Sequence, residues 1–196
     1  MRKKNLLNFL RLTSTVFTFK ELLLLSRETI PALLRRRISY YVKQKELHPI
    51  RRGLYAKDSN YDRYELATKI FTPAYVSFET ILAQAGVIFQ YYSTIFVASY
   101  QTKDIVCGGQ AFSFKKLKDT ILTNKMGIER RDNYYAASPE RAFLDVLYLS
   151  KDYHFDNLAP LNKDKIFELL PLYTNKRMEQ KVRSYFKAFE IDEGLQ

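Results

Sequence analysis

The chain has 196 residues, of which 46% are hydrophobic, so it is long enough for one domain or two small ones and can bury a core. No apolar run approaches the ~20 residues of a membrane-spanning helix. The single cysteine, Cys107, excludes an internal disulfide. We therefore expect a folded cytoplasmic protein that does not enter a membrane, with Cys107 interpreted as a buried rather than a reactive thiol.

The formal net charge of +11 is unevenly distributed along the chain. Residues 1–57 contain 14 Lys and Arg but only three acidic residues, which accounts for the whole excess. The remaining 139 residues hold 18 charges of each sign. This asymmetry predicts a polyanion-binding domain, residues 1–57, joined through the polar junction "KDSNYD" to a neutral domain, residues 62–196.

The first helix is predicted over residues 3–12, where apolar positions recur at helical spacing. Asn8 and Arg11 interrupt the apolar part, so we interpret it as part of the mature protein rather than as a signal peptide. The spacing of Thr18 and Glu21 is that of a capping box, which predicts a second helix over residues 19–25.

A third helix is predicted from about residue 30 to residue 45, with Pro31 in its first turn. One side of it carries the apolar residues Ile30, Leu34, Ile38, Tyr41 and Val42. The runs "LHPI" and "LYA", on either side of "RRG", then predict a hairpin. Helix, helix, turn, helix and hairpin is the order of a winged helix-turn-helix, in which the third helix enters the DNA major groove.

The predicted DNA-binding residues lie on three neighbouring segments. Arginine suits this surface because its planar fork binds a guanine edge or a phosphate. Arg37 adjoins the packed side of the third helix. It could therefore cover the core with its stem instead of contacting DNA. RNA is less favoured because an aromatic stacking platform is missing, and a membrane surface because the apolar stripe is committed to a core. The predicted contacts are Arg27 and Thr29 in the turn, Arg35, Arg36, Ser39 and Lys43 on the third helix, and Arg51 and Arg52 on the wing.

The second domain is predicted to be α+β. Ser77 is interpreted as a helix cap and Pro139 as a helix starter. Its predicted helices cover residues 64–71, 78–85, 140–149, 163–170 and 175–189, and its predicted strands cover residues 94–100, 104–107 and 111–114, with a hairpin turning at Asp132 and Asn133.

The second domain shows no pattern typical of catalysis or of a bound cofactor. There is no phosphate-binding loop, and Cys107 and His154 have nothing else to support them as a nucleophile–base pair. Asp145 stands among apolar residues, where a structural ion pair with Arg141 is the favoured interpretation. We therefore predict a protein that is not an enzyme and that needs neither a cofactor nor a metal.

Four motifs resemble one known family, the AbiEi antitoxins of bacterial type IV toxin–antitoxin systems. They are "VFTFKEL", "IRRGLYA", "YELATKIFTPAYVSFETILAQAGVI" and "AASPERAFLDVLYL", which lie in this order between residues 14 and 172. The second half of the third motif, with Tyr75, Ser77, Glu79 and Thr80, and the fourth motif are the most specific. The resemblance implies an N-terminal winged helix-turn-helix followed by an α+β antitoxin-type domain.

The resemblance also implies a function. Such proteins are abortive-infection repressors that bind inverted repeats in their own promoter, and their C-terminal domain counteracts a nucleotidyltransferase-like toxin without a stable complex. We therefore expect a DNA-binding transcriptional repressor that acts as an antitoxin. The alternatives are a stand-alone winged-helix regulator without a toxin and, less favoured, a nucleic-acid-processing enzyme.

Overall fold

The computed structural model describes residues 11–193, so the helix predicted over residues 3–12 lies almost wholly outside the described residues. The first elements form what we call the N-terminal unit. The second helix, the third helix and the hairpin are all confirmed, whereas the first strand was not predicted. The elements of this unit are β1 (Val16–Thr18), α1 (Phe19–Ser26), α2 (Pro31–Lys43), β2 (His48–Arg51) and β3 (Leu54–Ala56).

The rest of the chain forms what we call the larger unit. All of its predicted helices and strands are present, while β4, α5 and the short helix η2 were not predicted. Its elements are α3 (Arg63–Ile70), β4 (Ala74–Val76), α4 (Glu79–Gln84), β5 (Ile95–Ser99), β6 (Lys103–Cys107), β7 (Gln110–Lys116), α5 (Asp119–Leu122), β8 (Ile128–Arg131), β9 (Tyr134–Ala137), α6 (Pro139–Leu149), α7 (Lys163–Leu169), η2 (Leu170–Tyr173) and α8 (Lys176–Glu193).

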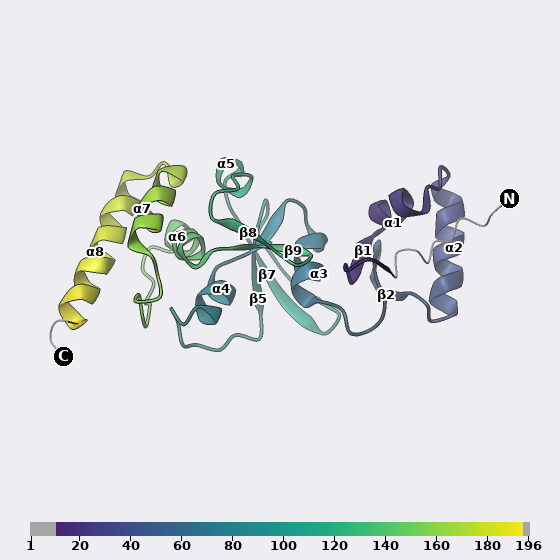
Figure 1. The fold of residues 1–196 in the computed structure, drawn as a ribbon, viewed down its shortest axis with the longest axis horizontal. Helices are drawn as coiled ribbons and strands as arrows, with labels where there is room; N and C mark the ends of the chain where they lie inside the picture. The colour runs from purple at the N-terminus through teal and green to yellow at the C-terminus, as the bar shows by residue number, and fades with distance from the viewer. Residues whose placement is uncertain (1–10, 194–196) are drawn as a thin grey trace.

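The fold is mixed α+β with two sheets in the described part of the chain. The small sheet is antiparallel, in the order β1-β3-β2, and the large sheet has the order β6-β7-β5-β4-β9-β8. Within the large sheet β5 runs parallel to β7 and β4 parallel to β9, and the other neighbours are antiparallel. The molecule is elongated, with α2 at one end and α8 at the other (Figure 1).

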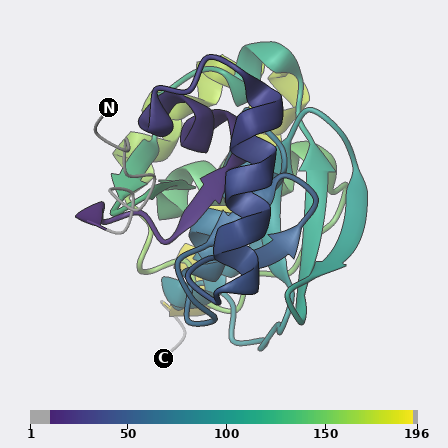
Figure 2. The ribbon, with the colours of Figure 1, turned by 90° about the vertical axis from the view of Figure 1, so that its right-hand side faces the viewer.

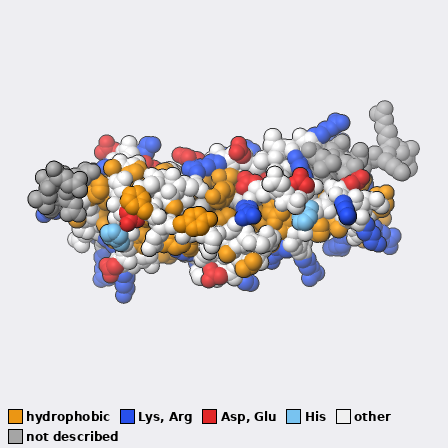
Figure 3. Space-filling model, turned by 90° about the horizontal axis from the view of Figure 1, so that it is seen from below, with side chains coloured by type: hydrophobic (Ala, Val, Ile, Leu, Met, Phe, Trp, Pro, Cys, Tyr) orange, Lys and Arg blue, Asp and Glu red, His pale blue; other side chains and the backbone are white. Residues whose placement is uncertain are grey.

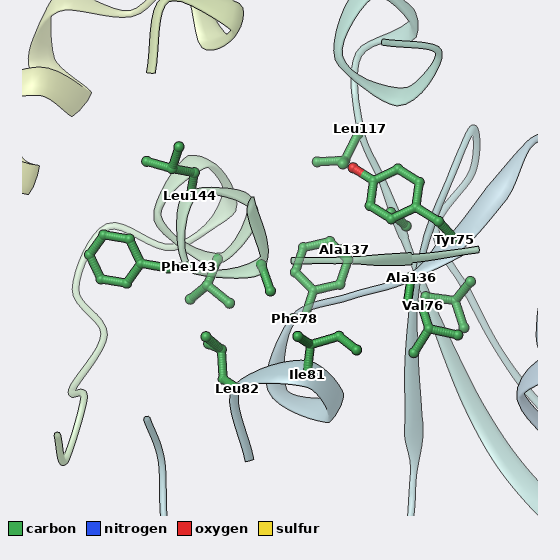
Figure 4. Close-up of a cluster of buried hydrophobic side chains, with 14 of the residues drawn as sticks. Tyr75, Val76, Phe78, Ile81, Leu82, Leu117, Ala136, Ala137, Phe143 and Leu144 are labelled. Carbon is green, nitrogen blue, oxygen red and sulfur yellow. The ribbon is translucent and has the colours of Figure 1, made fainter. Parts of the chain in front are cut away.

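Helices cover both faces of the large sheet. In Figure 1, α3 lies on the side of the N-terminal unit, and α4 and α6 lie on the opposite side. Figure 4 shows Phe78, which precedes α4, and Ile81 of α4 beside Ala136 and Ala137 of β9, with Phe143 of α6 beyond them. These side chains are at most 1% exposed, so the core sits between the sheet and these helices.

The N-terminal unit has a small core of its own. Its fully buried members are Phe17, Leu22, Leu34, Ile38 and Leu47. Ile30 was predicted to lie on the packed side of the third helix, but this is wrong because its side chain is 52% exposed. Ile30 precedes the first turn of α2 in extended backbone conformation, so its side chain does not follow the helical period.

The two units share buried surface. Val16 of β1 and Leu54 of β3 are 0% and 6% exposed, and both pack in the core of the larger unit. The polar junction itself contains no helix or strand and ends at Asp62, whose carboxylate caps α3. The units are therefore bridged by side chains of the small sheet rather than by the junction. Within residues 11–193 no helix combines the length and the apolar character that crossing a membrane requires.

Candidate nucleic-acid interface

Helix α2 turns one side to the small core and the other to solvent. Pro31 occupies its first turn, where a proline lacks no needed N–H. Leu34 and Ile38 anchor the buried side. Figure 2 looks onto the end of the molecule and shows α2 in front of the other elements. The predicted contact residues on this helix, Arg35, Arg36, Ser39 and Lys43, are all exposed.

The turn between α1 and α2 is held by local hydrogen bonds. The buried Ser26 donates its hydroxyl to the carbonyl oxygen of Leu23 at 3.0 Å and accepts the backbone N–H of Glu28 at 3.3 Å. Arg27 then ends α1 in the left-handed region, with φ of 50°. Arg27 and Thr29 are both exposed beside the start of α2, so the structure brings them next to the helix contacts.

The three consecutive arginines have different surroundings. The Arg35 guanidinium carbon lies 5.3 Å from the centre of the Phe19 ring, a cation–π contact that orients the side chain. Arg37 pairs with Glu28 at 3.5 Å. Among the described residues Arg36 makes no side-chain hydrogen bond or ion pair. The structural role considered for Arg37 therefore fits its position, whereas Arg36 is available to a ligand.

The hairpin β2–β3 is short and fixed against α1. It turns at Arg52 and Gly53, and Gly53 has φ of +82°, a conformation that favours glycine. The backbone N–H of Phe19 donates to the Gly53 carbonyl oxygen at 2.8 Å. Arg51 and Arg52 are both exposed. Because Phe19 contacts Arg35 as well, the β2–β3 hairpin and α2 converge on the same residue.

The hairpin is also braced by the larger unit. The ring of His48 on β2 stacks on Tyr61 with 6.2 Å between centroids. The Tyr61 hydroxyl reaches the turn between β6 and β7 at Gly108, where an added Cβ would lie 1.8 Å from it. Arg51 lies close enough to Cys107 to favour its thiolate, but burial outweighs this and raises the pKa of the Cys107 thiol. The interpretation of Cys107 as buried is confirmed.

Sequence reasoning missed the polar joint between the two units. Glu65 is 0% exposed and accepts backbone N–H groups of Thr15 and Val16 at 2.7 and 3.3 Å. Lys69 pairs with Glu65 at 3.0 Å and with Glu21 of α1 at 3.1 Å, and it donates to the Val16 carbonyl oxygen at 2.6 Å. The available signal was the pair of opposite charges four residues apart on α3.

Four residues of the two most specific sequence motifs, Tyr75, Ser77, Arg141 and Asp145, meet in a buried cluster rather than at the surface. The carboxylate of Asp145 accepts hydrogen bonds from the hydroxyls of Tyr75, Ser77 and Tyr173 at 2.9, 2.8 and 2.7 Å. Arg141 Nε lies 3.4 Å from the same carboxylate, which confirms the predicted pair. All five residues are at most 2% exposed. The interpretation of Ser77 as a helix cap is wrong, because Phe78 precedes α4 and the Ser77 hydroxyl binds Asp145.

The buried cluster also ties distant segments together. Arg141 donates to the carbonyl oxygens of Met126 and Ile121 at 2.8 and 2.7 Å, so it links α6 to the chain around α5. Burial raises the pKa of Asp145, although the Arg141 guanidinium and the three hydroxyl donors oppose this. Pro139 starts α6 as predicted, with Ser138 as its cap. These contacts account for Tyr75, Ser77, Arg141 and Asp145 as a scaffold that holds the sheet, α5, α6 and η2 in place.

Neither a metal site within the described part of the chain nor a family relationship was found. No group of three His, Cys, Asp or Glu side chains within residues 11–193 is arranged to hold a metal ion. The raised pKa of Cys107 is the opposite of what a nucleophilic thiol requires. No model of a known protein family matches the chain, and no curated protein matches it significantly.

Proposed function

We propose that this protein binds double-stranded DNA through a winged helix-turn-helix formed by its N-terminal unit. Helix α2 would lie in the major groove, and the β2–β3 wing would contact the backbone beside it. The observation that carries this proposal is the exposure of all eight expected contact residues on one turn, one helix face and one hairpin. Phe19, which contacts both Arg35 and the Gly53 backbone, keeps the helix and the wing together.

Electrostatics supports DNA as the partner. The whole excess of positive charge lies in residues 1–57, and a duplex presents one phosphate charge per ~1.7 Å of its axis. RNA would call for a sheet of stacking aromatics. Tyr40 is 58% exposed, but it lies on α2 and makes an edge contact with Tyr41 rather than forming such a platform.

An anionic membrane surface is a second candidate partner. The apolar stripe of the third helix was expected to be buried in a core, but Ile30 is exposed. Not all of the large apolar residues near α2 are committed to the core. The exposed ones are Leu24 at 70%, Leu25 at 43%, Ile30 at 52% and Leu33 at 41%. Basic surfaces with exposed apolar residues bind the headgroup region of anionic membranes. Vesicles with and without phosphatidylserine separate this candidate from DNA binding.

The regulatory role rests on the motif resemblance. We propose that the protein represses its own operon and acts as the antitoxin of a type IV system. The larger unit would be a non-enzymatic part that is needed against the toxin. Its neutral charge balance and the lack of a metal-binding cluster among the described residues support this division.

The first experiment measures DNA binding by fluorescence anisotropy with a duplex from upstream of the protein's own gene. The full chain is compared with the double variant Arg35→Ala/Arg36→Ala. The matched control is Lys165→Ala/Arg177→Ala, which removes the same charge from exposed sites on α7 and α8, at the far end of the molecule. We expect affinity to fall with the first variant and to change little with the control. Equal loss in both would contradict the assigned surface.

The second experiment tests the antitoxin role by co-expression with an adjacent toxin-like gene. The full chain and a folded variant with Arg35, Arg36, Arg51 and Arg52 replaced by Ala should both protect the cell. We use whole chains because Val16 and Leu54 lie in the core of the larger unit, so cutting at the junction would open that core. Loss of protection in the variant would mean that antagonism acts through DNA binding. Lack of protection by the full chain would leave a stand-alone regulator.

A further inference from the structure

The segment between α4 and β5 exposes aromatic side chains far from α2. Phe89, Tyr91 and Tyr92 are 72%, 91% and 37% exposed. The backbone beneath them is held firmly, because Phe89 N–H donates to the Asp156 carboxylate at 2.8 Å and the Val87 carbonyl accepts the N–H groups of residues 156 and 157. Large exposed aromatics on an anchored segment are typical of an interaction surface rather than of a mobile loop.

These three aromatics form part of the wall of a hollow of about 460 Å³. Its only charged lining residue is Glu79, which pairs with Lys115 at 2.9 Å and is therefore neutralised. The hollow has the size of a ligand pocket, and Tyr91, whose side chain is 91% exposed, stands at its rim. Its lining also includes Thr80, Gln84 and Ile88. We call this hollow and the three aromatics the aromatic flank.

We propose that two copies of this chain associate through the aromatic flank, with Tyr91 of each copy inserted into the hollow of the other. A two-fold interface needs one patch that is complementary to itself, and an exposed ring at the rim of an open hollow meets that need. Tyrosine is also suited to the hollow, because its ring can pack on Ile88 while its hydroxyl meets polar groups of Gln84 or Thr80.

Charge favours a second copy over a nucleic acid at this place. Residues 87–94 contain no charged side chain, although the chain as a whole carries a net charge of +11. Two copies can therefore approach here without repulsion between like charges. The neighbouring exposed residues carry both signs, so Lys151 of one copy can face Asp152 or Asp156 of the other. Residues 87–94 themselves offer a polyanion no cationic side chain, and the neighbouring Lys151 is balanced by Asp152 and Asp156.

The position of the aromatic flank leaves the candidate DNA surface free. The segment after α4 runs along the lower edge of the molecule in Figure 1, whereas α2 lies at the right-hand end. Figure 3 looks onto this lower side and shows hydrophobic side chains gathered at the surface along its middle and left. The association does not require DNA binding. Where the proposed function also holds, the dimer carries two recognition helices.

The first test measures the mass of the full chain by sedimentation equilibrium over a wide range of concentrations. We expect a reversible monomer–dimer equilibrium. Tyr91→Lys should raise the dimer dissociation constant by about tenfold or more, because it places a charge in each hollow. Tyr135→Lys, which changes an exposed tyrosine on β9, should leave the constant unchanged. A chain that stays monomeric throughout, or a dimer that tolerates Tyr91→Lys, would overturn the proposal.

The second test separates this dimer from any other. Tyr91→Cys and Gln84→Cys variants are mixed and oxidised with diamide, and we expect a disulfide that joins one variant to the other. The native Cys107 is buried and serves as the internal control in each variant alone. A dimer without this mixed disulfide contradicts the insertion of Tyr91. Both tests are made without DNA, so their failure does not bear on the proposed DNA binding.

Discussion

The carboxylate of Glu65 on α3 accepts a hydrogen bond from the backbone N–H of Thr15 at 2.7 Å, across 50 residues of sequence. The same oxygen accepts the Thr15 hydroxyl at 2.7 Å, and the other oxygen pairs with Lys69 at 3.0 Å. A buried carboxylate with several donors holds its partners strongly, because each would be unpaired without it. This residue therefore fixes the small sheet to the larger unit.

Replacing Glu65 by alanine should lower the free energy of unfolding by about 3 kcal/mol or more, because the change leaves buried N–H groups and an ammonium without their acceptor. Urea denaturation followed by circular dichroism measures this. Glu46→Ala removes an exposed glutamate and should change stability by less than ~0.5 kcal/mol. Similar losses in the two variants would show that the joint contributes little.

Replacing the three arginines of α2 one at a time should affect two different properties, DNA binding for Arg35 and Arg36 and stability for Arg37. Arg36→Ala, and Arg35→Ala to a similar degree, should cost about 1–3 kcal/mol of binding and relax the preference at one base position. Arg37→Ala should instead act on stability, since Arg37 pairs with Glu28. Binding-site selection on each variant decides this. An unchanged preferred sequence in both Arg35→Ala and Arg36→Ala would refute their role as base readers.

The wing arginines should act on all sequences alike. Arg51→Ala and Arg52→Ala should weaken specific and random duplexes by similar factors, because phosphate contacts carry no base information. Each phosphate contact that is lost should reduce the slope of log affinity against log salt by about 0.9. Arg51 lies near Cys107, so we expect the larger change in slope for Arg52. A change of preferred site in Arg52→Ala would instead indicate base contact.

Most elements could be predicted from the sequence because their signals are local. Thr18 and Glu21 form the capping box that starts α1, and Pro31 and Ser138 lie where α2 and α6 begin. The strand β1 could not be predicted, because its three residues form a strand only by pairing with β3, 40 residues later at Val16 and Ala56. Short strands of this kind depend on tertiary contact rather than on their own residues.

The candidate site divides in the same way. The exposed side of α2 follows from the helical period, which places Arg36 opposite Leu34 and Ile38. The role of Ser77 could not be predicted, because its hydroxyl binds Asp145 from 68 residues away, and the local sequence also fits a cap. The exposed Tyr91 was missed for a related reason, since periodicity does not tell which aromatics a fold leaves uncovered.

The close approach of the Tyr61 hydroxyl to Gly108 gives a test of how the β2–β3 hairpin is braced. Gly108→Ala places a Cβ 1.8 Å from the Tyr61 hydroxyl, so the tyrosine that stacks on His48 has to move. Gly109→Ala is the matched control, because that glycine also has positive φ but has no neighbour within 4 Å of the added carbon. Thermal denaturation should show a greater loss for Gly108→Ala, and Tyr61→Phe should restore part of it. Equal losses of thermal stability in Gly108→Ala and Gly109→Ala would mean that backbone strain at positive φ, rather than the contact with Tyr61, causes the destabilisation.

The buried Asp145 gives a dependence of stability on pH whose sign follows from its pKa. Burial raises the pKa of the folded-state carboxyl above its ordinary value of 3.8. The folded protein therefore holds this proton more tightly than the unfolded chain does. The contribution of the protonated carboxyl to stability is complete below pH 3.8 and is lost as the pH rises through the raised folded-state pKa.

Asp145→Asn should remove this dependence, because the amide stays neutral while it keeps the size and one acceptor oxygen of the carboxyl. We expect the stability of the wild-type protein relative to this variant to fall as the pH rises from about 4 toward neutrality. Urea denaturation at several pH values measures the difference, in which the other carboxylates largely cancel. Ser77→Ala removes a donor that lowers the pKa of Asp145, so it should move the loss to higher pH. A relative stability that rises with pH would show that Arg141 and the hydroxyls outweigh burial, with Asp145 charged in the folded state.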